Sequence, residues 1–345
     1  MGMIRWVAAI VGSGLLLGLL YVLISLWLLI APIAANLIGY GFSNYYLRQQ
    51  QQFYYVHGPM RSIWQADAGC AEAHEQLGYT ARLGECQFVN AEFNTTLHYT
   101  ERGWMMPTQS NGPKGRLVVV GDSQSMAWGV DHHESFSALL AAKGYTVNNY
   151  AISSYATEQQ ILAVLDREEF READTLIIQY CENDMDKNKR RLSDYLQEEI
   201  ALYRSQQTPS PLSFPQTLVN AAARFFENLS VSDLFRAPLH YFRAIGRGHG
   251  LPAYSVEKTE QHKFHLLDVL RQFPRLDQKQ VLVFYSNSYG KKFSDWSEYQ
   301  GNIRLLDLDL RRHHYHRIDD HLNRDGHRHV AEQLAIILSG MRSAL

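Results

Sequence analysis

The sequence predicts an α/β protein in which helices cover both faces of a mostly parallel sheet. From residue 116 onward, short apolar runs alternate with segments whose apolar residues recur every three or four positions. This alternation is typical of βαβ units, in which each strand is followed by a crossover helix. The run Leu117–Val120 is apolar at consecutive positions, as expected for a strand that is buried on both faces. The pattern predicts a three-layer domain.

The expected elements of this domain follow in chain order. We expect strands at residues 117–121, 146–152, 174–181, 280–286 and 303–308. We expect helices near residues 134–143, 157–169 and 327–338. An insertion at about 187–275 contains helical stretches broken by prolines and glycines, and it interrupts a domain predicted to span residues 116–345. Before it, residues 46–115 are expected to form a pre-domain with one or two strands between 87 and 99.

The N-terminal part of the chain has the composition of a membrane segment. Residues 6–38 contain no Asp, Glu, Lys or Arg, and they exceed the length of about 20 residues that spans a bilayer. A cleavable signal peptide is the alternative, but its apolar region runs only about 7 to 15 residues. We therefore predict an uncleaved, single-pass transmembrane anchor with its flank in residues 1–45.

The cysteines bear on the compartment. Cys70 and Cys86 lie close together in a polar segment, and a disulfide between them would contribute about 3 kcal/mol in an oxidising compartment. Two unpaired thiols in a cytosolic domain are the alternative. Cys181 ends an apolar run and is expected to be a small buried side chain. We expect a bacterial inner-membrane protein whose main domain faces the periplasm or the exterior.

The charge balance and the spacing of the histidines lead us to expect neither nucleic acid nor a metal ion as a partner. The chain has 33 Lys and Arg against 35 Asp and Glu, so it lacks the basic excess that nucleic-acid binding requires. The 15 histidines include three at 313, 314 and 316 and two at 327 and 329, but no spacing matches a common metal motif. We expect no metal and no cofactor. We expect His327 to begin the last helix and the other histidines of these groups to be solvated.

A serine and a histidine far apart in the chain form the candidate active site. Ser123 follows the predicted strand 117–121, at the edge of the sheet where open α/β folds place their active sites. About 200 residues later come Asp319, Asp320 and His321. His321 would take the serine proton and Asp319 would orient the imidazole, with Asp320 as an alternative acid. Taken singly, each residue also fits a cap or a polar loop.

Four short blocks resemble those of the SGNH (GDSL-type) hydrolases in order and spacing. They are Gly121-Asp-Ser-Gln-Ser125, the block 149–157, Glu182-Asn-Asp184 and the segment 319–327. The resemblance covers about residues 117–186 and 280–338. It implies a flavodoxin-like fold with a five-stranded parallel sheet, and an activity of ester hydrolysis or acyl transfer.

The resemblance also implies an oxyanion hole. The backbone N–H of Ser123, expected to begin a helix, would donate to the developing anion. The side-chain amide of Asn183 and the backbone N–H of Ser154 would be the other donors. Ser154 stands where the family usually has glycine, so its Cβ makes a positive φ more costly and narrows the pocket.

These observations predict a membrane-anchored serine esterase or O-acyltransferase. We expect its substrate to be an acyl ester, in particular an acetyl ester of an envelope or exported glycan. A lipid ester is an alternative, because the anchor would place the domain beside acyl chains. A catalytically silent envelope scaffold or glycan-binding subunit is another, since fold does not establish function. The sequence names no protein partner.

Overall fold

The computed structural model describes most of the chain from residue 63 onward. The described residues are 13, 16–24, 27, 63–90, 92–105, 114–206, 256–286, 299–316, 319 and 321–342. The described elements from residue 63 onward lie in one compact unit. Within the described residues, no helix combines the length and the apolar character needed to cross a bilayer. Most of the predicted anchor, residues 6–38, lies outside them.

A mixed sheet of nine strands forms the centre of this unit. In spatial order its strands are β10 (Tyr299–Gln300), β11 (Ile303–Leu306), β9 (Gln280–Tyr285), β8 (Thr175–Tyr180), β6 (Arg116–Val120), β7 (Thr146–Asn149), β5 (Gly103–Trp104), β4 (Phe93–Thr100) and β3 (Gly84–Asn90). The five strands from β11 to β7 are parallel, and the remaining pairs are antiparallel. The prediction of an α/β fold with a mostly parallel core is confirmed.

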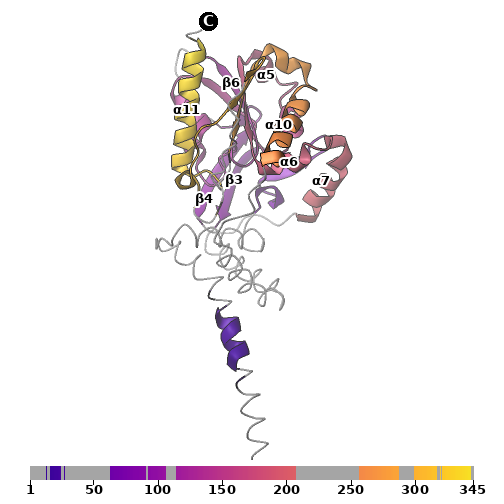
Figure 1. The fold of residues 1–345 in the computed structure, drawn as a ribbon, viewed down its shortest axis with the longest axis vertical. Helices are drawn as coiled ribbons and strands as arrows, with labels where there is room; N and C mark the ends of the chain where they lie inside the picture. Colours follow the sequence, from indigo (N-terminus) through magenta and orange to yellow (C-terminus); the bar gives the residue numbers. More distant parts are fainter. Residues whose placement is uncertain are drawn as a thin grey trace, which may run out of the picture. The chain divides into compact units, whose positions relative to one another are not determined.

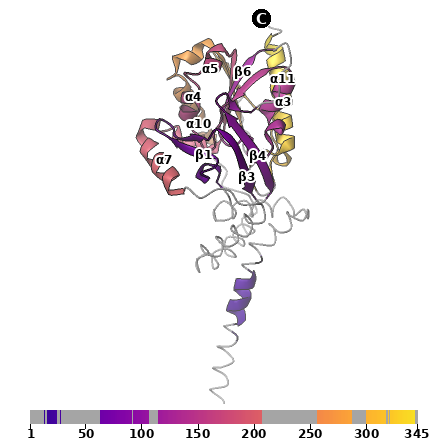
Figure 2. The ribbon, with the colours of Figure 1, turned by 180° about the vertical axis from the view of Figure 1, so that it is seen from behind.

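Helices pack on both faces of the parallel strands (Figures 1 and 2). Successive side chains of a strand point to opposite faces, and β6 shows this division clearly. Leu117 and Val119 belong to the core under α3 (Phe136–Ala142) and α11 (Arg324–Arg342). Val118 and Val120 belong to the core under α4 (Thr157–Leu162), α5 (Glu168–Glu172) and α10 (Val256–Leu270). Burial on both sides explains why the run is apolar at every position.

Several predicted boundaries change in the structure. The single helix expected at 157–169 is two short helices, α4 and α5, joined by turns. The last helix, α11, extends beyond the predicted 327–338 at both ends. Strand β7 ends at Asn149, rather than at residue 152, because the Asn149 side chain accepts a hydrogen bond from Ala151 N at 2.9 Å and turns the chain. The described part of the insertion contains α7 (Leu192–Gln206) and α10.

The strands of the predicted pre-domain belong to the same sheet as the parallel strands. β3 and β4 form an antiparallel hairpin, and β5 pairs with β7 through Trp104 and Asn149. Gly103 permits this approach, because its φ of +90° is unfavourable for other residues and a Cβ there would collide with the Asn149 carbonyl. The sheet is therefore wider than the five strands expected, since residues of the range 46–115 extend it.

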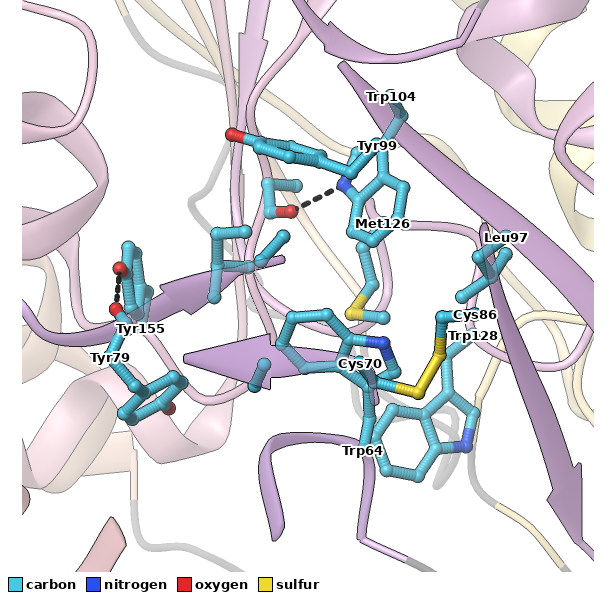
Figure 3. Packing of buried hydrophobic residues seen from close by; sticks show 14 of the residues in the cluster. Trp64, Cys70, Tyr79, Cys86, Leu97, Tyr99, Trp104, Met126, Trp128 and Tyr155 are labelled. Atoms are coloured by element: carbon cyan, nitrogen blue, oxygen red, sulfur yellow. Dashed lines mark hydrogen bonds between the residues drawn. A yellow bond between two sulfur atoms is a disulfide. The ribbon is translucent and has the colours of Figure 1, made fainter. Parts of the chain in front are cut away.

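A second part of the same segment packs against the loops that follow β6 and β7. It comprises η2 (Trp64–Ala66) and a two-stranded sheet of β1 (Ala71–His74) and β2 (Gly78–Ala81). A disulfide joins Cys70 to Cys86 of β3, and Figure 3 shows it among aromatic side chains and Met126. The buried cluster around it includes Trp64, Trp104 and residues of both loops. We call residues 63–82 the disulfide-linked segment.

Candidate active site

Ser123 lies in a turn at the carboxyl end of β6, the central strand of the nine-stranded sheet. Ser125 N and Met126 N each donate to the Asp122 carbonyl at 3.1 Å, which makes one helical turn. Ala127 then adopts a φ of +73°, which ends the turn. The prediction that Ser123 begins a helix is therefore wrong, because the next α-helix, α3, starts only at Phe136.

Ser123, His321 and Asp319 form a continuous hydrogen-bonded chain. His321 Nε2 lies 2.7 Å from Ser123 Oγ, although the two residues are 198 positions apart in the sequence. On the other side of the ring, Nδ1 hydrogen-bonds to Asp319 Oδ1. The three residues are buried: Ser123 is 7% exposed, His321 3% and Asp319 1%. Asp320, the alternative acid, lies outside the described residues.

Trp128 contacts both the histidine and the aspartate of this chain. Its indole stacks on the His321 imidazole, with ring centroids 4.4 Å apart and 13° between the planes. The indole Nε1–H donates to Asp319 Oδ2 at 3.3 Å. Sequence reasoning missed Trp128, because no spacing rule relates it to a histidine on a distant loop.

Two further side chains hold the loop that carries His321. Glu92, at the β3–β4 turn, accepts a hydrogen bond from Asp319 N at 2.7 Å. Gln124, the residue after the serine, accepts one from Leu322 N at 2.9 Å. These contacts bind the loop to the antiparallel extension on one side and to the serine turn on the other. Glu92 belongs to the range 46–115, in which the sequence indicated no catalytic residue.

The loop after β7 lies beside the serine turn. Ile152 N donates to the Gly121 carbonyl at 3.2 Å, and the buried Asn149 side chain donates to the Ser125 carbonyl at 2.7 Å. Ser154, in this loop, has a φ of +63°. It therefore adopts the left-handed conformation that glycine takes at low cost. Ser154 thus has a positive φ at a position where the SGNH hydrolases usually have glycine.

The third predicted donor, Asn183, lies on the segment that follows β8. Its backbone forms part of α6 (Glu182–Lys187), but its side chain lies outside the described atoms. The neighbouring Asp184 is fully buried and accepts hydrogen bonds from Cys181 N at 2.9 Å and from Gln160 Nε2 at 3.0 Å. Burial, and then the charge of Asp122, raise the pKa of Asp184 well above its usual value. Burial therefore favours the protonated form of this carboxyl.

Asp122, Cys181 and Asp184 are the one group of possible metal ligands among the described residues. The Cys181 thiol donates to Asp122 Oδ2 at 2.8 Å, and Cys181 is half-buried, whereas full burial was expected. Hydrogen bonds from Cys181 to Asp122 and to Asp184 join these groups. The cluster connects the β8 loop to the serine turn through side chains that sequence reasoning did not select.

The histidines near the end of the chain differ from expectation. His314 is only 6% exposed, so the prediction that it is solvated is wrong. Its ring stacks on that of His329 with centroids 4.3 Å apart. His327 is 1% exposed, and its Nδ1 accepts a hydrogen bond from Phe136 N at 3.2 Å. These rings pack between α11 and its neighbours. A neutral imidazole can be buried in this way when one of its nitrogens has a hydrogen-bond partner.

In comparisons with known proteins, no family model and no curated protein matches this chain. The chemistry of the site is therefore argued from its own residues and their geometry.

Proposed function

We propose that this protein is a serine esterase or O-acyltransferase of the SGNH type. One observation carries the proposal: a buried alcohol, imidazole and carboxylate lie in hydrogen-bonded sequence, with 2.7 Å between Ser123 Oγ and His321 Nε2. A nucleophile, a base and an orienting acid in this order are the parts that acyl transfer requires. Further support comes from the parallel strand order β7-β6-β8-β9-β11, which corresponds to the 2-1-3-4-5 order of flavodoxin-like folds.

In the first half of the reaction, Ser123 Oγ attacks the carbonyl carbon of the ester and its proton passes to His321 Nε2. Asp319 holds the ring through Nδ1 and stabilises the imidazolium that forms. The tetrahedral intermediate collapses when the carbon–oxygen bond to the leaving alcohol breaks and His321 returns the proton to that alcohol. The product is an acyl-enzyme on Ser123.

In the second half, water or a sugar hydroxyl attacks the acyl-enzyme. His321 accepts the proton of the incoming group and passes it to Ser123 Oγ as the serine ester bond breaks. Attack by water gives hydrolysis, and attack by a sugar hydroxyl gives transfer. The negative oxygen that forms in each half would be held by the backbone N–H groups of Ser123 and Ser154 and by the Asn183 amide.

The substrate class and the compartment extend this proposal. We assign the activity to acyl esters, in particular acetyl groups on an envelope or exported glycan. The disulfide between Cys70 and Cys86 supports an oxidising, extracytoplasmic location. The uncharged segment 6–38 supports attachment to the bacterial inner membrane, with the hydrolase domain in the periplasm or outside the cell.

A fluorophosphonate probe tests the nucleophile directly. The full-length protein in detergent should be labelled at Ser123, and Ser123→Ala should abolish the labelling. Ser339→Ala, on the exposed end of α11, is a matched control that should be labelled as wild type is. If the folded wild-type protein is not labelled, the chain is a silent scaffold rather than an enzyme.

Nitrophenyl esters of increasing chain length then test the substrate class. Acetyl release should exceed release of long acyl chains, and it should disappear in Ser123→Ala. Preferential hydrolysis of long chains would replace the glycan assignment with a lipid one. Mass analysis of the acyl group trapped on Ser123 after incubation with envelope extract would identify the donor.

A further inference from the structure

The turn at Ser153 and Ser154 requires support from outside its own loop. Ser154 has a φ of +63°, a conformation that a residue with a Cβ adopts at a cost and keeps only where its surroundings hold it. Glycine would need no such support. The contacts made by the two serines therefore show what maintains the turn.

One glutamine amide bridges the hydroxyls of both serines. Gln65 Oε1 accepts a hydrogen bond from Ser153 Oγ at 2.9 Å. Gln65 Nε2 donates to Ser154 Oγ at 3.2 Å. Gln65 belongs to η2 in the disulfide-linked segment, where the neighbouring Trp64 is fully buried against Trp104 with ring centroids 5.8 Å apart. Gln65 therefore lies on a short helix that the buried Trp64 side chain holds in place.

Two other side chains fix the carbonyl groups of the turn. The Tyr79 hydroxyl donates to Ser153 O at 2.6 Å, and Lys187 Nζ donates to Ser154 O at 2.9 Å. Lys187 is itself paired with Glu199 of α7 at 2.9 Å. A trans peptide is planar, so its N–H points opposite to its C=O. By holding the Ser153 carbonyl, the Tyr79 hydroxyl orients the peptide that carries the Ser154 N–H.

We propose that Gln65 is a positioning residue for the oxyanion hole. It draws the two serine hydroxyls toward the disulfide-linked segment, keeps Ser154 in the left-handed conformation and directs the Ser154 N–H at the developing anion. The same bond turns the Ser154 hydroxyl toward Gln65, which offsets the narrowing expected of a serine at a glycine position. This inference rests on the proposed esterase activity. Gln65 lies outside the four sequence blocks that resemble those of the SGNH hydrolases.

Gln65→Ala tests the role of the bridge in the full-length protein with a short-chain nitrophenyl ester. We expect kcat to fall about 10- to 100-fold and KM to change less than about 3-fold, because the oxyanion exists only after the chemical step begins. Gln76→Ala is a matched control, since Gln76 is an exposed glutamine of the same segment, and its kcat should equal that of wild type. Gln65→Met, which fills the same space without hydrogen bonds, serves if the alanine variant does not fold.

Rescue by glycine separates positioning from a general structural role. In the double variant Gln65→Ala/Ser154→Gly, glycine takes the positive φ without support, so kcat should return to within about 3-fold of Ser154→Gly alone. A residue needed only for folding would not be rescued in this way. Thermal unfolding of each variant, followed by circular dichroism, accompanies the kinetics.

Each outcome decides between the two proposals. If wild type shows Ser123-dependent turnover but Gln65→Ala retains full kcat, or glycine fails to restore it, the positioning role is overturned and the esterase stands. If wild type shows no Ser123-dependent turnover, the esterase proposal is overturned and the positioning role with it.

Discussion

The indole of Trp128 lies nearly parallel to the imidazole of His321, with ring centroids 4.4 Å apart. The face of an indole carries negative potential and attracts a cation placed over it. His321 becomes an imidazolium when it accepts the serine proton, so the stacking favours the charged state that the proposed reaction creates. The hydrogen bond from Trp128 Nε1 to Asp319 Oδ2 also fixes the acid that orients the ring.

Replacing Trp128 should therefore slow turnover. Trp128→Phe keeps an aromatic face but loses the N–H donor, and we expect kcat/KM to fall about 3- to 10-fold. Trp128→Leu loses both, and a loss of about 10- to 100-fold is expected. Steady-state kinetics on a short-chain ester measure this, with denaturant unfolding as a check that the core around Phe88 is retained. Equal activity of Trp128→Leu and wild type would contradict the role of the indole.

The identity of the acid is tested by two adjacent substitutions. Asp319→Asn should lower kcat about 10³- to 10⁴-fold, because an amide cannot stabilise the imidazolium and favours the wrong histidine tautomer. Asp320→Asn is the matched control and should change kcat less than about 5-fold, since Asp319 makes the hydrogen bond to His321 Nδ1. A larger loss in the Asp320 variant would transfer the role to that residue.

The disulfide should contribute substantially to stability. The Cys70→Ser/Cys86→Ser variant loses a cross-link between residues 16 positions apart, and the free energy of unfolding should fall by about 2–4 kcal/mol. Urea unfolding measures this difference. A reductant should destabilise wild type and leave the double variant unchanged. Equal stability of the oxidised wild type and the double variant would show that the cross-link does not stabilise the fold.

Acid should destabilise the protein through buried histidines. Burial is the main cause that lowers the pKa of His327 to about 3 and the pKa of His316 to about 4. In the unfolded chain both rings titrate near pH 6.5. At a pH between the folded-state and unfolded-state pKa of each ring, the unfolded chain therefore binds more protons than the folded protein. The contribution of the neutral rings is fully present above about pH 6.5 and is lost progressively as the pH falls toward 4 and 3.

Urea unfolding at pH 7, 6 and 5 measures the pH dependence of the free energy of unfolding. Each proton taken up only by the unfolded chain lowers that free energy by about 1.4 kcal/mol per pH unit, well below pH 6.5. His327→Gln removes one titrating group and should make the decline shallower by about that amount. His133→Gln, which alters an exposed ring, is the control and should leave the slope unchanged. An identical slope in His327→Gln would refute the assignment.

The position of Ser123 at the edge of the sheet was predictable from the sequence. Ser123 closely follows a short apolar run whose pattern identifies a buried parallel strand, and parallel strands end at a common edge. The five parallel strands were placed for the same reason. The predicted helix start at Ser123 failed because a local turn, ended by the positive φ of Ala127, leaves no pattern that distinguishes it from a helix.

What the sequence determined by itself is the set of buried strands and the candidate nucleophile, base and acid, since each is encoded by adjacent residues. Only the tertiary structure showed that β3, β4 and β5 extend the sheet, that Trp128 stacks on His321, and that Gln65 holds the Ser154 turn. Hydrophobic periodicity specifies which face of an element is buried, but not the distant element that covers it. Those partners are chosen by packing across the whole domain, and so they appear only in the fold.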